Sequence, residues 1–239
     1  MLKIGHRMVK KKKKDLIAEQ RLENIETSLS NTERFIVENQ NIISIVVGVV
    51  VVIILAFFGF QKYYMEPQNM EAQEQMFNAQ RYFESDSLDK ALYGDGNSLG
   101  FIDIASDYGI TKAGNLANYY AGLAFLKKGN FDQALDYLKS FKSSDHVVGS
   151  MAKGAIGDAY LEKGDRSSAV SYYLEAAHRD ANDFSTPLFL LKAGHVYELE
   201  KNYSKAIDAY TMIKEDYPKS NEARDIDKYI ARANGYISN

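Results

Sequence analysis

The chain has 239 residues, of which 46% are hydrophobic and 26% charged, and this composition argues against pervasive disorder. It contains no cysteine, which excludes disulfides, thiolate metal sites and cysteine nucleophiles without assigning a compartment. Its formal net charge of −3 does not suggest a strongly basic nucleic-acid binder, and three prolines beside 17 tyrosines and 12 phenylalanines favour a helical protein packed with aromatic side chains.

Charge divides the chain into three parts. Residues 1–41 carry nine Lys and Arg against six Asp and Glu, whereas residues 42–60 carry no charge at all. Residues 61–239 hold the other 20 basic and 26 acidic side chains, a net charge of −6. We therefore expect a basic arm, an apolar segment and an acidic body.

The basic arm, residues 1–41, contains a run of five lysines: Lys10, Lys11, Lys12, Lys13 and Lys14. This run has three interpretations, namely an orientation signal, a contact for anionic lipid or the ribosome, and a solvated tail. Apolar positions then recur at helical spacing from Ala18 to Ile36, which predicts a helix on the membrane or against a partner helix. The sequence Ser30 to Glu33 fits a capping box, so a further helix is predicted to start there.

The apolar segment, residues 42–60, predicts a transmembrane helix. Its uncharged residues reach about 28 Å as a helix, enough for the hydrocarbon core of a bilayer. Lys and Arg are dense before the segment and sparse just after it. The positive-inside rule therefore predicts a single-pass protein with residues 1–41 in the cytoplasm and the large C-terminal part outside.

The acidic body contains three related segments, residues 121–141, 156–176 and 193–213. Each has a glycine, an aromatic residue three positions later and a turn residue four positions beyond that. An alanine and then a large side chain follow at fixed spacing. In the three copies these positions are Gly122, Phe125, Gly129, Ala134 and Leu138; Gly157, Tyr160, Gly164, Ala169 and Tyr173; and Gly194, Tyr197, Lys201, Ala206 and Tyr210. This pattern predicts two helices that are joined by a turn and touch at the small residues. Such helical hairpins are expected to stack on one another.

The flanks of these segments are also expected to be helical. Residues 61–112 are predicted to form a linker helix and a degenerate first hairpin. Its helices are expected at 68–84 and 98–108, around a loop over 86–97 that contains a short helix. Residues 113–219 hold the three hairpins, and residues 220–239 a C-terminal capping helix. The predicted fold class is all-α: a transmembrane helix followed by an α-solenoid.

Motifs for chemistry are not found in the sequence. None of the four histidines has a helical i, i+4 partner or an acidic set at metal-ligand spacing. The sequence Gly94 to Asn97 lacks the remaining ligands of an EF-hand loop and is predicted to be a tight turn. We expect no enzyme activity, no catalytic residue, no metal and no cofactor.

The three segments resemble tetratricopeptide repeats (TPR) over residues 113–219, with Pro218 at the family's closing proline. The chain departs from the family at its early Trp, which is Asn118, Lys153 and Leu190 here, and at Lys201 in place of a turn glycine. The resemblance implies a scaffold that binds a peptide or a protein in a concave groove. Candidate groove residues in the family's register are Leu116, Tyr119, Leu123, Asp158, Leu191 and His195. Packing within the superhelix is the equal alternative for each of them.

The whole arrangement resembles the YfgM-like proteins of bacterial inner membranes. Residues 113–122, 154–160, 186–194 and 222–233 are similar to the Bacteroidetes version of that family. The resemblance implies an inner-membrane protein with a periplasmic C-terminal domain. Its role would be that of an ancillary subunit of the SecYEG-type translocon that binds a PpiD-like periplasmic chaperone. The alternative is a structural adaptor of another envelope assembly or secretion complex.

Overall fold

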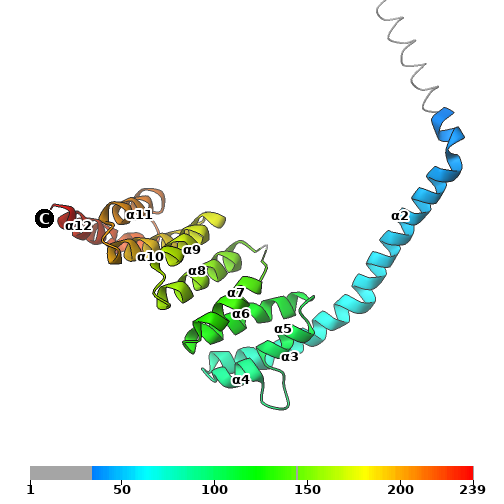
Figure 1. Cartoon of the computed structure of the whole chain (residues 1–239), viewed down its shortest axis with the longest axis horizontal. Helices are drawn as coiled ribbons and strands as arrows, with labels where there is room; N and C mark the ends of the chain where they lie inside the picture. The colour runs from blue at the N-terminus through cyan, green and yellow to red at the C-terminus, as the bar shows by residue number, and fades with distance from the viewer. Residues whose placement is uncertain (1–33, 144, 239) are drawn as a thin grey trace, which may run out of the picture. The chain divides into compact units, whose positions relative to one another are not determined.

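The computed structural model describes residues 34–143 and 145–238 (Figure 1). The lysine run 10–14, the helical stripe before Ile36 and the capping box at Ser30 lie outside the described residues. Every regular element within the described ranges is a helix and none is a strand, so the all-α prediction is confirmed. The chain divides into two units, one ending at Tyr64 and one beginning at Met65.

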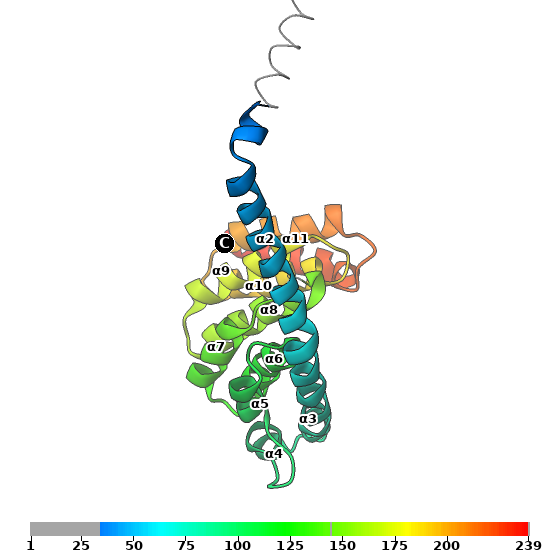
Figure 2. The same cartoon turned by 90° about the vertical axis from the view of Figure 1, so that its right-hand side faces the viewer.

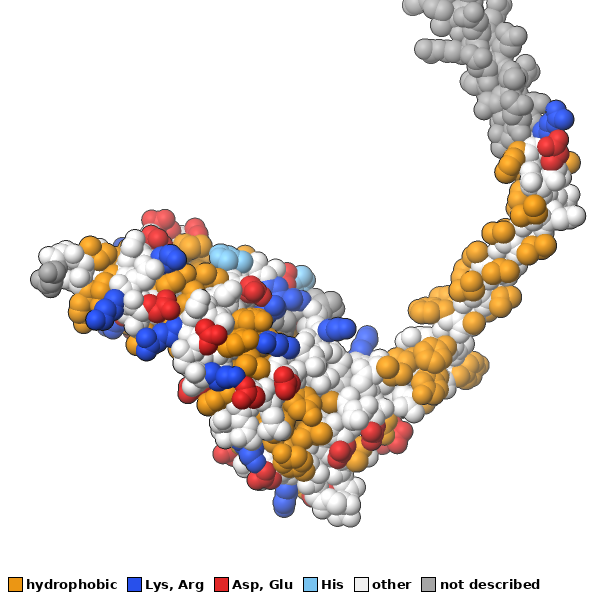
Figure 3. Space-filling model, in the orientation of Figure 1, with side chains coloured by type: hydrophobic (Ala, Val, Ile, Leu, Met, Phe, Trp, Pro, Cys, Tyr) orange, Lys and Arg blue, Asp and Glu red, His pale blue; other side chains and the backbone are white. Residues whose placement is uncertain are grey.

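The first unit contains helix α2 (Gln40–Phe60), which includes the predicted transmembrane segment. Its apolar side chains are exposed all along the helix (Figure 3). Helix α2 is the apolar part of a longer continuous helix, Gln40–Glu84. Within the described residues this is the one helix that is long and apolar enough to cross a membrane. A π-helical turn, η1 (Gln61–Met65), follows, and the Phe60 and Tyr64 rings stack there at 5.0 Å.

The second unit contains the three predicted hairpins as pairs of antiparallel helices. They are α6 (Lys112–Lys127) with α7 (Phe131–Ser140), α8 (His146–Glu162) with α9 (Arg166–Arg179), and α10 (Ser185–Leu199) with α11 (Tyr203–Asp216). The second helix of each pair also packs on the first helix of the next pair, so the hairpins lie side by side in chain order (Figure 2). A 3₁₀ turn, η2 (Glu222–Asp225), and helix α12 (Ile226–Ile237) cover the last pair.

Close contact between the helices of a pair explains the predicted small residues. A Cβ atom added to Gly122 would lie 2.5 Å from Cγ of Leu138. The same atom on Gly157 would lie 2.7 Å from Cδ1 of Tyr173, and on Gly194 it would overlap the Tyr210 ring. The second small position of each copy, Ala134, Ala169 or Ala206, is fully buried. The sequence spacing therefore marks the points where the two helices touch.

The predicted turn residue has the left-handed backbone conformation in all three copies. Its φ angle is 77° at Gly129, 83° at Gly164 and 58° at Lys201. In each copy the backbone N–H of the following residue donates to the carbonyl of the aromatic residue, as from Asn130 to Phe125 at 2.9 Å. This pairing satisfies a carbonyl at the end of the first helix and reverses the chain.

A fourth turn of the same kind lies at Asp86, between α3 (Glu66–Glu84) and α4 (Leu88–Tyr93). Asp86 has φ = 58°, and the N–H of Ser87 donates to the carbonyl of Tyr82 at 2.8 Å. The fully buried Ala79 and Ala91 occupy the two small positions of this hairpin.

Both helices predicted after this turn are present, because α4 lies within the loop 86–97 and α5 (Phe101–Asp107) lies within 98–108. The pairing differs from the prediction: α4, and not the helix at 98–108, follows the turn directly and packs on α3, whereas α5 packs mainly on α6. An ion pair supports the equivalence of α4 with a second helix, because Lys128 pairs with Asp89 as Lys163 pairs with Asp132 one repeat later. The segment 94–100 therefore interrupts the second helix of the first hairpin.

This interrupting segment is held by Asp95. Its Oδ1 accepts hydrogen bonds from the N–H groups of Asn97 (2.9 Å) and Ser98 (2.8 Å), and the Tyr82 hydroxyl donates to Oδ2 (2.6 Å). These bonds, that from Tyr82 foremost, lower the pKa of Asp95 to about 2. The Asp95 carboxylate thus accepts hydrogen bonds from groups of the protein itself, as is typical of an aspartate in a tight turn.

Candidate partner-binding site

The six candidate groove residues lie on the first helices of the three copies, and all are half-buried. Leu116, Tyr119 and Leu123 are on α6, Asp158 is on α8, and Leu191 and His195 are on α10. The Tyr119 ring lies 5.3 Å from the Phe141 ring, and burial raises the pKa of its hydroxyl. Part of the surface of these side chains is therefore used in packing between the repeats.

Asp158 makes its polar contacts within the stack. The Tyr173 hydroxyl donates to its Oδ1 at 2.6 Å, and Nζ of Lys192 lies 2.6 Å from Oδ1 and 2.8 Å from Oδ2. Burial, and then the bond to Asp158, raise the pKa of the Tyr173 hydroxyl. The carboxylate thereby links α8, α9 and α10, and any partner must share it with Lys192 and Tyr173.

His195 lines an open groove between α10, the start of α11 and α12, with a volume of about 610 Å³. We call it the tyrosine groove. Its residues are His195, Glu198, Leu199, Tyr203, Tyr229, Arg232 and Tyr236. The His195 ring lies 5.1 Å from the Tyr229 ring, and burial lowers the pKa of the imidazole. An ion pair of 2.7 Å between Arg232 and Glu198 joins α12 to α10.

The tyrosine groove offers apolar surface with a few polar groups. Leu199 and Tyr236 are 56% and 57% exposed, and the Tyr203 and Tyr236 rings stack at 4.9 Å. Aromatic side chains beside an arginine are typical of residues that dominate protein contacts. The groove can therefore bind an apolar or aromatic side chain of a partner.

Of the six candidates, His195 alone lines this groove. Sequence reasoning missed Tyr229, Arg232 and Tyr236 because it assigned residues 220–239 only a capping role. The signal available was the tyrosine and arginine content of that helix. Within the described residues no group of three or more His, Asp or Glu side chains could hold a metal ion.

Comparison with known proteins agrees with this architecture. Two family models, both described as tetratricopeptide repeat, match residues 116–145 and 155–221. A TPR repeat-containing protein of Methanocaldococcus jannaschii is 32% identical over 108 residues, which are 45% of this chain and 18% of that relative. This chain thus spans less than a fifth of the relative's length.

Two solved structures share the fold. A kinesin light chain protein of Podosopora anserina with nearly identical TPR-like repeats aligns with a TM-score of 0.54 at 13% identity, over 70% of this chain and 87% of that one. The MamA protein aligns with a TM-score of 0.51 at 16% identity, over 70% of this chain and 88% of that one.

Proposed function

We propose that this chain, a tetratricopeptide repeat protein over residues 116–145 and 155–221, is a membrane-anchored scaffold that binds a protein partner through its repeats. The observation that supports it is the combination of an apolar helix in α2 with a stack of helical hairpins in one chain. Such repeats are typical of scaffolds without enzyme activity. A membrane anchor raises the effective concentration of a partner that is bound weakly by the repeats.

The proposed orientation places the repeats outside the cytoplasm, in the periplasm of a bacterium. It is supported by the nine Lys and Arg before the apolar segment and by their scarcity just after it, where Lys62 and Arg81 are the basic residues within about twenty positions. A reporter enzyme fused after Asn239 should then be active only outside the cytoplasm. Activity of that reporter inside the cell would overturn the orientation and the role that follows from it.

The proposed role is that of an ancillary subunit of the Sec translocon, with a PpiD-like chaperone bound to the repeats. The YfgM-like arrangement of basic arm, apolar segment and repeats supports this assignment. A structural adaptor of another envelope complex is the alternative, and the same scaffold would serve it.

Copurification of the full chain after gentle solubilisation separates these two roles. Recovery of the Sec channel and a PpiD-like chaperone supports the first role, and recovery of outer-membrane assembly factors supports the second. A chain with residues 42–60 exchanged for an unrelated span is the matched variant. It should lose the channel and keep the chaperone, because the repeats are unchanged.

A further inference from the structure

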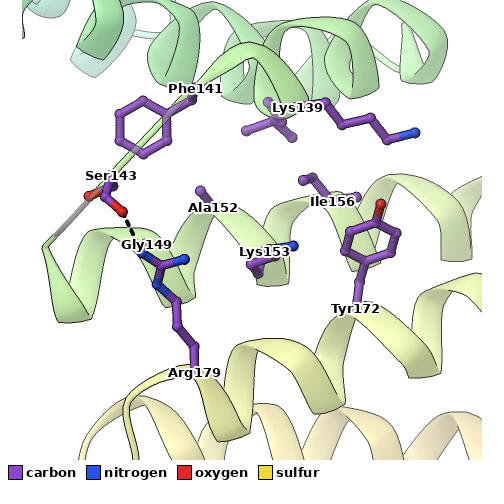
Figure 4. A pocket seen from close by; sticks show the side chains of 10 residues that line it. Lys139, Phe141, Ser143, Gly149, Ala152, Lys153, Ile156, Tyr172 and Arg179 are labelled. Carbon is purple, nitrogen blue, oxygen red and sulfur yellow. Dashed lines mark hydrogen bonds between the residues drawn. The ribbon is translucent and has the colours of Figure 1, made fainter.

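A pocket of about 160 Å³ lies between α7, α8 and α9, where the first and second copies meet (Figure 4). Three of its lining residues are cationic, Lys139, Lys153 and Arg179, and none is acidic. They come from three different helices, and Arg179 lies at the opposite end of the pocket from Tyr172 (Figure 4). We call it the basic pocket, and none of the six candidate groove residues lines it.

Two of the three cations are held by aromatic rings. The Tyr160 and Tyr172 rings stack at 5.4 Å. Nζ of Lys139 lies 5.0 Å from the centre of the Tyr160 ring, and Nζ of Lys153 lies 5.2 Å from the centre of the Tyr172 ring. A ring face attracts an ammonium group, so each lysine has a preferred position before any ligand binds.

Arg179 is fixed at the other end of the pocket. Its guanidinium donates to the carbonyl of Ser143 and covers Gly149, where an added Cβ atom would lie 2.5 Å from Nε. Residue 149 must therefore be small for the arginine to lie there. The arginine also connects α9 to the segment that joins α7 and α8.

The lysines retain capacity for an anion. The ammonium of Lys139 donates to the uncharged Tyr160 hydroxyl at 2.8 Å. Lys153 pairs with Glu175 at 2.6 Å, but the Glu175 side chain is 49% exposed. An exposed pair of this kind is weak, so a better-placed carboxylate can replace Glu175.

We propose that the basic pocket binds an acidic side chain, Glu or Asp, of the partner protein. This inference rests on the proposed function, because it assumes that the ligand of the repeats is a protein. The pocket has room for one carboxylate-bearing side chain, with Lys139 and Lys153 at the carboxylate and Ile156 and Tyr172 beside its methylene groups. Charge-assisted hydrogen bonds from fixed lysines give both affinity and register.

The test is a titration of the full chain in detergent with a fluorescein-labelled Glu–Gly repeat peptide. In every sample Lys10–Lys14 are replaced by glutamine, so that the lysine run does not bind the peptide. Lys139→Gln and Lys153→Gln should each weaken binding about tenfold, since a hydrogen bond to a charged group is lost. High salt should also weaken it, and a Gln–Gly peptide should not bind.

Lys205→Gln is the matched control, because Lys205 also lies over a tyrosine ring, 5.5 Å from the centre of Tyr197, outside the pocket. Equal affinities of the parent and both pocket variants would overturn the inference. A Lys139-dependent affinity for soluble short-chain phosphatidylglycerol, without affinity for the Glu peptide, would also overturn it. No chaperone or channel is present, so this result is independent of the copurification that tests the proposed function.

Discussion

Gly157 lies against the ring of Tyr173, and a Cβ atom added to residue 157 would be 2.7 Å from Cδ1 of that ring. The ring is buried, and its hydroxyl donates to Asp158, so it cannot move without loss of that hydrogen bond. Gly157→Ala should therefore lower the free energy of unfolding of a 65–239 fragment by about 1–3 kcal/mol through overpacking. Urea unfolding measures the change, with Ser171→Ala on the exposed face of α9 as the control. An unchanged midpoint would show that the two helices can separate freely.

Lys201 is the non-glycine residue among the turn residues of the three copies, and its φ of 58° is strained for an L-residue with a side chain. Lys201→Gly should raise the free energy of unfolding by about 0.5–1 kcal/mol, because relief of strain exceeds the added entropy of the unfolded chain. The reverse change, Gly129→Lys in the first copy, should lower it by a similar amount. Thermal melts of the two variants should therefore shift in opposite directions, and shifts in the same direction would contradict the shared turn.

The turns also show how far sequence pattern reaches. Gly129 and Gly164 predict their turns because glycine favours a positive φ, and the register then places Lys201 at the third. Asp86 gives no such signal by itself, and the segment 94–100 shifts the rest of its hairpin out of the common spacing. A match of Ala79, Tyr82 and Ala91 to Gly122, Phe125 and Ala134 is the pattern that could have revealed the fourth turn.

Surfaces made by neighbouring repeats were harder to predict. The register correctly placed Asp158 and His195 on first helices, but the partners of Asp158 come from two other helices. Lys139 and Tyr160 are 21 positions apart, and their contact depends on how one hairpin packs on the next. Alignment of the three copies reveals the positions that are in contact within a hairpin. A single sequence carries little information on the contacts between neighbouring hairpins.

The ion pair of Lys192 with Asp158 should stabilise the contact between the second and third copies. Both side chains remain about one-third exposed, at 35% and 34%, so solvent screening reduces its contribution. A double-mutant cycle with Lys192→Met and Asp158→Asn should give a coupling free energy of about 0.5–1 kcal/mol. Asparagine keeps an acceptor for the Tyr173 hydroxyl, so the cycle isolates the ion pair. Coupling near zero would mean that the pair forms without stabilising the stack.

His195 should make stability depend on pH below its ordinary pKa of 6.5. Burial lowers the pKa of the folded-state imidazole, so the unfolded chain binds the proton more readily. Stability from the neutral ring is therefore present above pH 6.5 and is lost as the pH falls through the lower folded-state value. Glu198 opposes this shift and Arg232 adds to it.

Chemical unfolding at pH 7.5 and at pH 5.5 measures this dependence. The free energy of unfolding should fall less between the two values for His195→Gln than for the parent chain. The other histidines are present in both proteins, so the difference reports His195. An identical fall in the two proteins would contradict the prediction.

Tyr119 is the residue of α6 that we expect to contribute most to docking on the candidate groove. It is aromatic and half-buried, and its ring lies 5.3 Å from the Phe141 ring and 5.6 Å from the Tyr120 ring. A rigid aromatic side chain of this kind loses little entropy on binding and often dominates an interface. Tyr119→Ala should therefore weaken binding of the 65–239 fragment to the proposed chaperone partner about tenfold or more while the fold is retained.

Copurification and circular dichroism check the two parts of this prediction, with Tyr93→Ala as the control because Tyr93 is 55% exposed on α4. Loss of helical signal in Tyr119→Ala would identify Tyr119 as a core residue. Normal binding by a folded variant would move the docking face away from α6. The tyrosine groove would then be tested by Tyr236→Ala and the basic pocket by Lys139→Gln, because these two surfaces share no lining residue. A partner that depends on only one of them is thereby assigned to one end of the repeat stack or to the junction of its first two copies.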